Sequence, residues 1–228
     1  MICRMFRQMF VITSLWLGIF AVALFVGAGT LHWLRGWAFF WEIAVFSYGI
    51  GAWLAVYDPD LLKSRLFVRL RSGAAPDRVL LPAAVPTYLA WLVLMGLDAR
   101  RFGWSHVPAA LGWLGAVLIA LCMGVSVAAF AYNSFAAPEL RLQAQRAQHL
   151  ITNGPYAVVR HPLYAGATFY FLGAPLLLGS WWGLLMLPLG MAALAWRIGR
   201  EEDMLRLAFP DYERYATQVR FRLIPGVW

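Results

Sequence analysis

The sequence predicts an all-α polytopic membrane protein, a bundle of about six transmembrane spans that includes a C-terminal helical hairpin. Hydrophobic residues make up 62% of the 228-residue chain and charged residues 13%, whereas soluble domains carry about 25% charged residues. The apolar residues form runs near the roughly 20 residues that a spanning helix needs. Basic residues flank these runs and fall mostly on one side of the predicted membrane. The length fits one membrane domain without a second, soluble domain.

Four apolar runs precede the hairpin. We expect transmembrane helices over Met9–Gly29, Trp37–Tyr57, Val79–Leu97 and Val107–Tyr132. Basic residues precede the first run, as they do in a signal peptide. That run is nevertheless long enough to span a bilayer and more spans follow, so we expect an uncleaved first helix.

The last apolar stretch, Leu163–Trp196, has 34 residues without a charged side chain. One straight helix of this length would measure about 51 Å, but the hydrocarbon core of a bilayer is only about 30 Å thick. The stretch must therefore turn back, and Gly179-Ser180 near its middle predicts where it turns. We expect a tight hairpin of two helices, which brings the total to six crossings and both termini to one side.

The distribution of lysine and arginine predicts the orientation. Arg35, Arg100 and Arg101 fall on one side, and the other sixteen basic residues fall on the side of the termini. These sixteen are Arg4, Arg7, Lys63, Arg65, Arg69, Arg71, Arg78, Arg141, Arg146, Arg160, Arg197, Arg200, Arg206, Arg214, Arg220 and Arg222. Because cytoplasmic segments are enriched in lysine and arginine, we expect an inner, cytoplasmic membrane protein with both termini in the cytoplasm.

The polar residues divide the chain into two functional regions. Residues 1–132 are the predicted N-terminal transmembrane helices. Residues 133–228 contain the hairpin at 163–196, the polar segment before it and a cytoplasmic tail. Together with the polar loop Asp58–Arg78, these segments lie on the predicted cytoplasmic side, so we expect any polar chemistry there.

Composition and motifs exclude several classes of function. The net charge is +8, but no nucleic-acid recognition motif accompanies it, so we expect no nucleic-acid partner. Cys3 and Cys122 form neither a disulfide framework nor a zinc pattern, and no other metal-ligand spacing stands out. The sequence also lacks a G-x-G-x-x-G turn after a strand and a Walker-type loop.

The densest cluster of polar and turn residues is Gly154-Pro155-Tyr156-Ala157-Val158-Val159-Arg160-His161-Pro162-Leu163-Tyr164-Ala165-Gly166. Pro162 suits the first turn of a helix, which puts Arg160 and His161 at the helix N-terminus. Free backbone N–H groups beside a guanidinium make an anion site. Arginine, histidine and tyrosine are also ordinary at a membrane boundary, so the motif alone fits an interfacial anchor equally well.

A second polar cluster, Arg197-Ile198-Gly199-Arg200-Glu201-Glu202-Asp203, ends the hairpin's second helix. Arg197 and Glu201 are four residues apart and share one helical face. Because the hairpin is tight, we expect them near Arg160 and His161. Carboxylates here can hold ribose hydroxyls or an ammonium group, but a solvated, self-paired charge cluster is common and is the better explanation of this segment taken alone.

Asn153–Trp228 resembles the C-terminal region of the isoprenylcysteine carboxyl methyltransferase and phospholipid methyltransferase superfamily. The shared pattern is G-P-Y-x-x-x-R-H-P-x-Y-x-G, a hairpin, R-x-x-x-E-E, F-P-D-Y-x-x-Y and a closing R-x-I-P. Three segments upstream of the motif also resemble the bacterial branch: Asn133-Ser134-Phe135, Arg141-Leu142-Gln143 and His149-Leu150-Ile151-Thr152. The good match covers about 95 residues, and the pattern is weak on substrate.

The resemblance implies that the chain is an integral membrane methyltransferase that uses S-adenosylmethionine and methylates a lipid-soluble acceptor. The implied cofactor-binding residues, with Arg160 of the anion site and Glu202 beside Glu201 included, are His149, Leu150, Ile151, Tyr156, Arg160, His161, Pro162, Tyr164, Glu201 and Glu202. The implied catalytic residues are Arg197, on the acceptor side, and Glu201. A carboxylate acceptor needs no general base, whereas an amine or thiol needs one, and His161 and Glu202 are the candidates.

Two other functions remain open on the sequence. Some membrane sterol reductases share a related H-P-x-Y-x-G motif and use NADPH, although Leu163 and Ala167 replace the asparagine and glutamate associated with them. A non-enzymatic membrane factor with the same fold is the other alternative. The full set of polar motif residues favours the methyltransferase.

Overall fold

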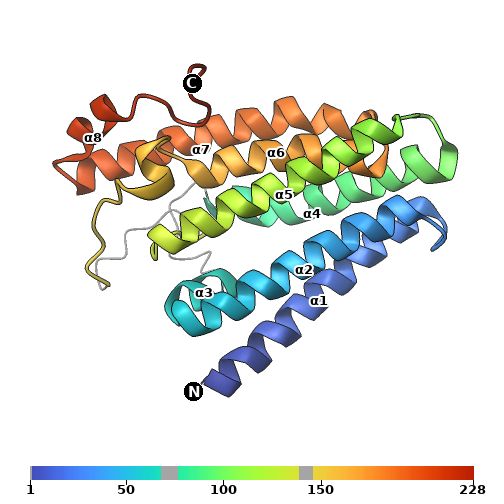
Figure 1. Cartoon of the computed structure of the whole chain (residues 1–228), viewed down its shortest axis with the longest axis horizontal. Helices are drawn as coiled ribbons and strands as arrows, with labels where there is room; N and C mark the ends of the chain where they lie inside the picture. Colours follow the sequence, from blue (N-terminus) through green and yellow to red (C-terminus); the bar gives the residue numbers. More distant parts are fainter. Residues whose placement is uncertain (1, 68–76, 139–145) are drawn as a thin grey trace.

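The computed structural model describes residues 2–67, 77–138 and 146–228, and all regular elements in these ranges are helices. Figure 1 shows the long helices side by side in one bundle. The α-helices are α1 (Ile2–Ala28), α2 (Leu34–Tyr57), α3 (Pro59–Leu66), α4 (Asp77–Gly96), α5 (Ala109–Tyr132), α6 (Pro162–Leu178), α7 (Met186–Ala208) and α8 (Tyr212–Gln218). The π-helix η2 (Leu97–Phe102) extends α4, and the 3₁₀-helices η4 (Gly154–Ala157) and η5 (Trp182–Leu185) precede α6 and α7.

Five helical segments of the described chain are long and apolar enough to cross a membrane. They are Cys3–Ala28, Leu34–Tyr57, Pro82–Phe102, Ala109–Tyr132 and Trp182–Ala208. The remaining apolar helix, α6, has 17 residues and a length of about 26 Å, slightly less than the hydrocarbon core of a bilayer. The all-helical, multi-pass prediction is confirmed, with α6 shorter than an ordinary span.

Several helix boundaries differ from the prediction. The first helix begins at Ile2 rather than Met9. Its basic residues Arg4 and Arg7 are exposed, and arginine is a good helix former. The helix therefore extends beyond the apolar run at its N-terminal end. The fourth run begins at Ala109 rather than Val107 because Pro108 occupies the N-cap.

The predicted turn of the hairpin is confirmed at Gly179. This glycine ends α6 with φ at 93°, in the left-handed region that favours glycine. The next residue, Ser180, is fully buried and donates its hydroxyl to Asp98 Oδ2 at 2.5 Å. The Ser105 hydroxyl donates to the same oxygen at 2.7 Å. The buried Asp98 carboxylate therefore ties the hairpin turn to the end of α4.

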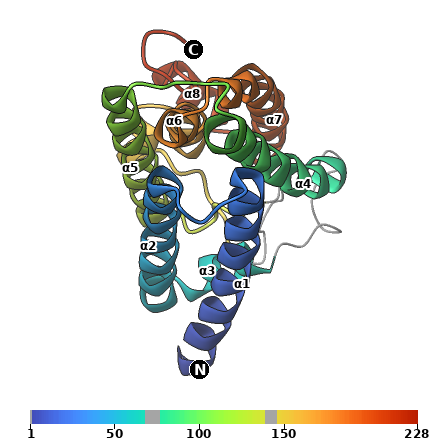
Figure 2. The same cartoon turned by 90° about the vertical axis from the view of Figure 1, so that its right-hand side faces the viewer.

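Helix α6 lies between α5 and α7 (Figure 2). It packs more closely against α5 than against α7, its partner in the predicted hairpin. Glycines permit this approach: a Cβ on Gly115 would lie 2.4 Å from the backbone nitrogen of Leu177, and one on Gly173 would lie 2.7 Å from the Gly115 carbonyl oxygen. Small residues that let helix backbones meet are typical of membrane helix pairs. The close packing of α6 against α5 thus fixes the position of α6.

The connections between helices separate into two ends of the bundle. The α1–α2 and α4–α5 connections lie at one end in Figure 1, and α3 and α8 lie at the other, which we call the α8 end. The polar segments predicted to share one side of the membrane meet at the α8 end. Of the basic residues assigned to that side, Arg69, Arg71 and Arg141 lie outside the described residues.

Candidate active site

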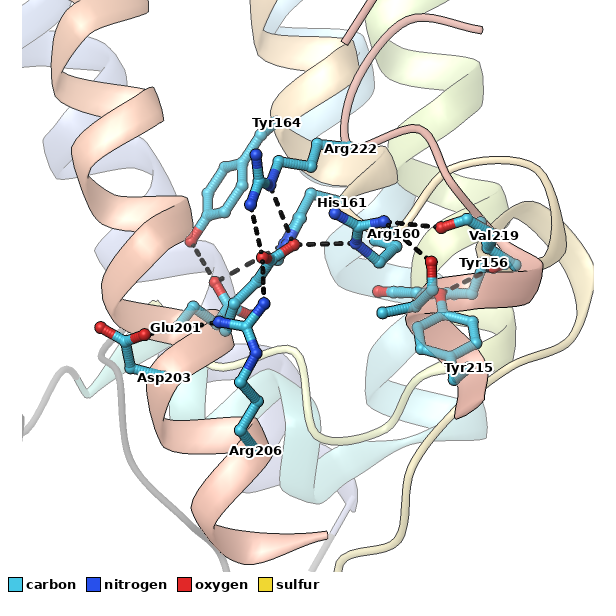
Figure 3. A network of polar contacts seen from close by, with 12 residues as sticks. Tyr156, Arg160, His161, Tyr164, Glu201, Asp203, Arg206, Tyr215, Val219 and Arg222 are labelled. Carbon is cyan, nitrogen blue, oxygen red and sulfur yellow. Dashed lines mark hydrogen bonds and ion pairs between the residues drawn. The ribbon is translucent and has the colours of Figure 1, made fainter. Parts of the chain in front are cut away.

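The N-terminus of α6 and the C-terminal half of α7 meet at the α8 end through one tyrosine (Figure 3). The Tyr164 hydroxyl donates to Glu201 Oε2 at 2.8 Å, and Arg197 Nε donates to the Tyr164 hydroxyl oxygen at 2.8 Å. The His161 ring stacks on the Tyr164 ring with centroids 5.6 Å apart. The prediction that the hairpin brings these two polar clusters together is confirmed.

A buried carboxylate lies behind this contact. The Glu202 side chain is fully buried, and Arg160 Nε donates to its Oε1 at 2.8 Å while Arg222 Nη2 donates to its Oε2 at 3.0 Å. Arg206 Nη2 lies 3.3 Å from Oε2, and His161 Nε2 lies 3.4 Å from Oε1. A carboxylate removed from water needs such partners to keep its charge. Glu202 thus joins the start of α6, the end of α7 and the C-terminal segment.

The structure corrects the prediction of a free anion site at the start of α6. The backbone N–H groups of Arg160 and His161 donate to the carbonyl oxygens of Phe221 and Arg222, at 3.0 and 2.9 Å. Arg160 Nη1 also donates to the Val219 carbonyl oxygen at 2.7 Å. The C-terminal segment therefore accepts the hydrogen bonds that were expected to be available to an anion. The prediction considered only residues near the helix N-terminus and not this distant segment.

A cavity of about 680 Å³ opens beside the Tyr164 contact. The lining includes every predicted site residue except Glu202: His149, Leu150, Ile151, Tyr156, Arg160, His161, Pro162, Tyr164, Arg197 and Glu201. Glu202 is not among the lining residues of this cavity, and its buried carboxylate is bonded to Arg160 and Arg222. A cofactor contact of Glu202 therefore stays a prediction.

The cavity wall also contains residues that the sequence analysis did not assign to the site, among them Asn133, Tyr212 and Tyr215. Asn133 Nδ2 donates to the Tyr156 hydroxyl at 2.9 Å, and the Tyr215 hydroxyl donates to the Tyr156 carbonyl oxygen at 2.8 Å. Burial raises the pKa of Tyr156 to about 12, so its hydroxyl stays neutral. These residues belong to the Asn133-Ser134-Phe135 and F-P-D-Y-x-x-Y segments, which are part of the family resemblance. Their spacing in the sequence did not indicate that they pack against the cavity.

Comparison with known proteins finds two similarities to membrane methyltransferases. The sequence model of the phospholipid methyltransferase family matches residues 111–211, from α5 to the residue before α8. The chain is also 26% identical over 185 residues to protein-S-isoprenylcysteine O-methyltransferase of Dictyostelium discoideum, and the match covers 77% of this chain and 70% of that protein. The chain is a membrane methyltransferase, with similarity to this family and a distant similarity to the Dictyostelium enzyme. Methyltransferases of the family use S-adenosylmethionine.

The cavity of the methyltransferase fits such a cofactor in size and chemistry. Its volume of about 680 Å³ lies within the roughly 300–1,000 Å³ of small-molecule sites. Its wall combines the Glu201 carboxylate, which suits hydroxyl or ammonium groups, with the aromatic rings of His149 and Tyr156 and the aliphatic side chains of Leu150 and Ile151. Polar groups that fix orientation among apolar ones are typical of cofactor sites.

A second cavity of the methyltransferase, about 850 Å³ in volume, is lined mainly by apolar side chains of α1, α4 and α7, which we call the apolar groove. Trp16, Val85 and Leu189 are among its exposed lining residues. The lining residues that the groove shares with the first cavity are Ile43, Ser47, Arg65, Tyr88 and Arg197. The first cavity, of about 680 Å³, which we call the polar cavity, therefore shares part of its wall with the apolar groove, and Arg197 belongs to that shared wall.

Proposed function

We propose that the methyltransferase binds S-adenosylmethionine in the polar cavity and transfers its methyl group to a lipid-soluble acceptor held in the apolar groove. The observation that carries the proposal is the shared wall of the two cavities at Arg197. A cofactor that enters from water and an acceptor that enters from the bilayer would meet at this wall. The cofactor would not have to enter the bilayer, and the acceptor would not have to enter water. The Dictyostelium relative, by its name, methylates an oxygen of an isoprenylcysteine, and we propose a similarly lipophilic acceptor here.

The proposed cofactor contacts are the residues of the polar cavity wall, with Glu201 as the charged one. Residues in direct contact would be His149, Leu150, Ile151, Tyr156, His161, Pro162, Tyr164 and Glu201. Arg160 lines the same wall, but its hydrogen bonds to Glu202 and Val219 support a positioning role. Arg160 and Glu202 would hold the two helix ends at a fixed separation behind the cofactor.

The bound cofactor supplies an electrophilic methyl group on a sulfonium, and methyl transfer depends mainly on proximity and alignment. Arg197 is the residue that we propose to orient the acceptor. Its Nε donates to Tyr164 and its Nη2 donates to the Pro138 carbonyl oxygen, so the guanidinium is fixed on two sides. A carboxylate acceptor needs no base, whereas His161, in the cavity wall, is the candidate to take a proton from an amine or thiol.

We also propose that the α8 end faces the cytoplasm of a bacterial inner membrane. The support is the excess of lysine and arginine in the segments assigned to this side. A cytoplasmic α8 end also opens the polar cavity toward the compartment in which a water-soluble cofactor is found.

The experiment is transfer of a radiolabelled methyl group from S-adenosylmethionine to a total lipid extract, with the labelled product identified. Ala193 lines the apolar groove and its exposed neighbour Ala192 does not. Ala193→Trp should block labelling while binding of S-adenosylhomocysteine persists, and Ala192→Trp should leave both unchanged. Equal labelling in the two variants would contradict the groove as acceptor site. Binding of NADPH in place of S-adenosylhomocysteine would contradict the proposed cofactor.

A further inference from the structure

Two tyrosine hydroxyl groups from different helices meet at the cavities. Tyr88 belongs to α4 and Tyr170 to α6, and their hydroxyl groups form a hydrogen bond with each other. Tyr88 lines both the polar cavity and the apolar groove, and Tyr170 lines the polar cavity. Tyr88 lies outside residues 111–211, so the family match does not assign it a role.

The Tyr88–Tyr170 pair has one hydrogen more than its bond uses. Each hydroxyl group carries one hydrogen, and the bond between the two groups uses only one of them. Within residues 2–67, 77–138 and 146–228, neither hydroxyl group has a second hydrogen-bond partner. One O–H group of the pair is therefore a donor without an acceptor.

A second pair of hydroxyl groups, Tyr48 and Ser14, shows the contrasting case. The Ser14 hydroxyl donates to the Phe10 carbonyl oxygen at 2.7 Å. The Tyr48 hydroxyl lies 2.8 Å from the Ser14 oxygen and donates to it, because the Ser14 hydrogen is already used. Both hydrogens of this pair thus have acceptors, and neither residue lines either cavity.

Aromatic rings hold the Tyr88–Tyr170 pair in apolar surroundings. The Trp91 ring centroid lies 6.0 Å from that of Tyr88 and 6.1 Å from that of Tyr170. Phe20 lies 6.3 Å from Tyr88, and Phe39 lies 6.2 Å from Tyr170, centroid to centroid. A donor without an acceptor is unfavourable in such surroundings. Because both tyrosines line a cavity, a bound molecule can supply the acceptor.

A third hydroxyl group of the shared wall is also available to a bound molecule. Ser47 of α2 lines both cavities, and its hydroxyl has no hydrogen-bond partner in the part of the chain that the structure describes. Ser126 in the polar cavity wall differs, because its hydroxyl donates to the Cys122 carbonyl oxygen at 2.8 Å. Helical serines often form this bond to the preceding turn. Ser47 and Tyr88 therefore present hydroxyl groups on the same wall.

We infer that the Tyr88–Tyr170 pair and Ser47 bind an uncharged oxygen, of a ketone, ester or ether, on a lipid that lies along the wall shared by the two cavities. The inference rests on the proposed function and narrows its acceptor class to lipids that carry such an oxygen. This oxygen accepts hydrogen bonds and donates none, which matches the spare donor of the pair. A chain of hydrocarbon alone leaves that donor without an acceptor and binds less tightly.

The test compares the binding of tritiated octadecane and of tritiated octadecanones to the full chain in dodecyl maltoside, by scintillation proximity. The ketone lies near the end, a third of the way along or at the middle of the chain, so that one probe brings it to the wall. For at least one octadecanone, the ratio of ketone to alkane affinity should be about fivefold higher in the wild type than in Tyr88→Phe/Tyr170→Phe, as expected for one hydrogen bond between uncharged groups. The comparison between proteins cancels the unequal partition of the probes into detergent.

The control variants separate the wall from hydroxyl loss elsewhere. Tyr48→Phe removes a tyrosine hydroxyl outside both cavities and should keep the wild-type ratio. Ser47→Ala should lower the ratio, whereas Ser126→Ala, which removes a hydroxyl already bonded to the backbone, should not. Binding of S-adenosylhomocysteine in each variant checks that the site is folded. If the double tyrosine variant fails this check, Ser47→Ala decides the test.

Equal ratios in the wild type and the folded double variant, for all three octadecanones, would overturn the inference. An unchanged ratio in Ser47→Ala would overturn it as well. These measurements need no methyl transfer. A chain that shows the expected ratios but neither binds S-adenosylhomocysteine nor methylates any lipid would instead overturn the proposed function.

Discussion

Glu201→Gln isolates the carboxylate proposed to contact the cofactor. The substitution keeps the size of the side chain and removes its charge. Glu201 accepts a hydrogen bond from Tyr164 at 2.8 Å, and its side chain is 28% exposed, so solvent screens part of its charge. Hydrogen bonds to charged groups contribute roughly 1.5–3 kcal/mol. Because of this screening the lower half of that range applies, roughly 1.5–2.25 kcal/mol, which corresponds to a loss of roughly 10- to 40-fold in affinity for S-adenosylhomocysteine.

Isothermal titration of the purified protein measures this loss. Asp203→Asn is the matched control, because Asp203 lies on the same helix, its side chain is 63% exposed, and it pairs with Arg206 away from the cavity. We expect the control to bind S-adenosylhomocysteine as the wild type does. Equal affinity in the wild type and Glu201→Gln would refute the placement of the cofactor against this carboxylate.

Three further substitutions separate catalysis from stability. Arg197→Ala should lower turnover about 100-fold, as expected when an acceptor is no longer aligned, with S-adenosylhomocysteine affinity nearly unchanged; Arg200→Ala in the same methyl-transfer assay should show no loss. Glu202→Gln should destabilise the fold by about 3–5 kcal/mol, because its cationic partners lose their buried counter-charge, and an unchanged melting temperature would disprove that role. Gly115→Val should lower the melting temperature by forcing α5 from α6, whereas Gly124→Ala, with open space at its Cβ, should not.

The membrane fold and the meeting of the two polar clusters follow from length and local pattern. A charge-free stretch too long for one span had to turn, and Gly179 was suited to that turn. Once the chain turns there, geometry alone returns Arg197 and Glu201 to the side of Tyr164. These conclusions needed only the rise of a helix and the thickness of a bilayer.

Two features of the site depend on contacts that local pattern does not encode. The Glu201-Glu202 pair looks symmetric in sequence, yet successive helical residues point in different directions, so one lines the cavity and the other is buried. The backbone donors of Arg160 appeared available at a helix terminus, but the carbonyl of Phe221, distant in sequence, accepts from them. Arg65 similarly reaches the cavity wall from α3, far from the motif.

The most direct test of the account is an experimental structure of the methyltransferase with S-adenosylhomocysteine bound. We expect the ligand in the polar cavity, in contact with Glu201 and with its sulfur facing the junction at Arg197. A ligand bound outside this cavity, or with its sulfur directed away from the apolar groove, would contradict the claim that cofactor and lipid acceptor meet between the two ends of the hairpin.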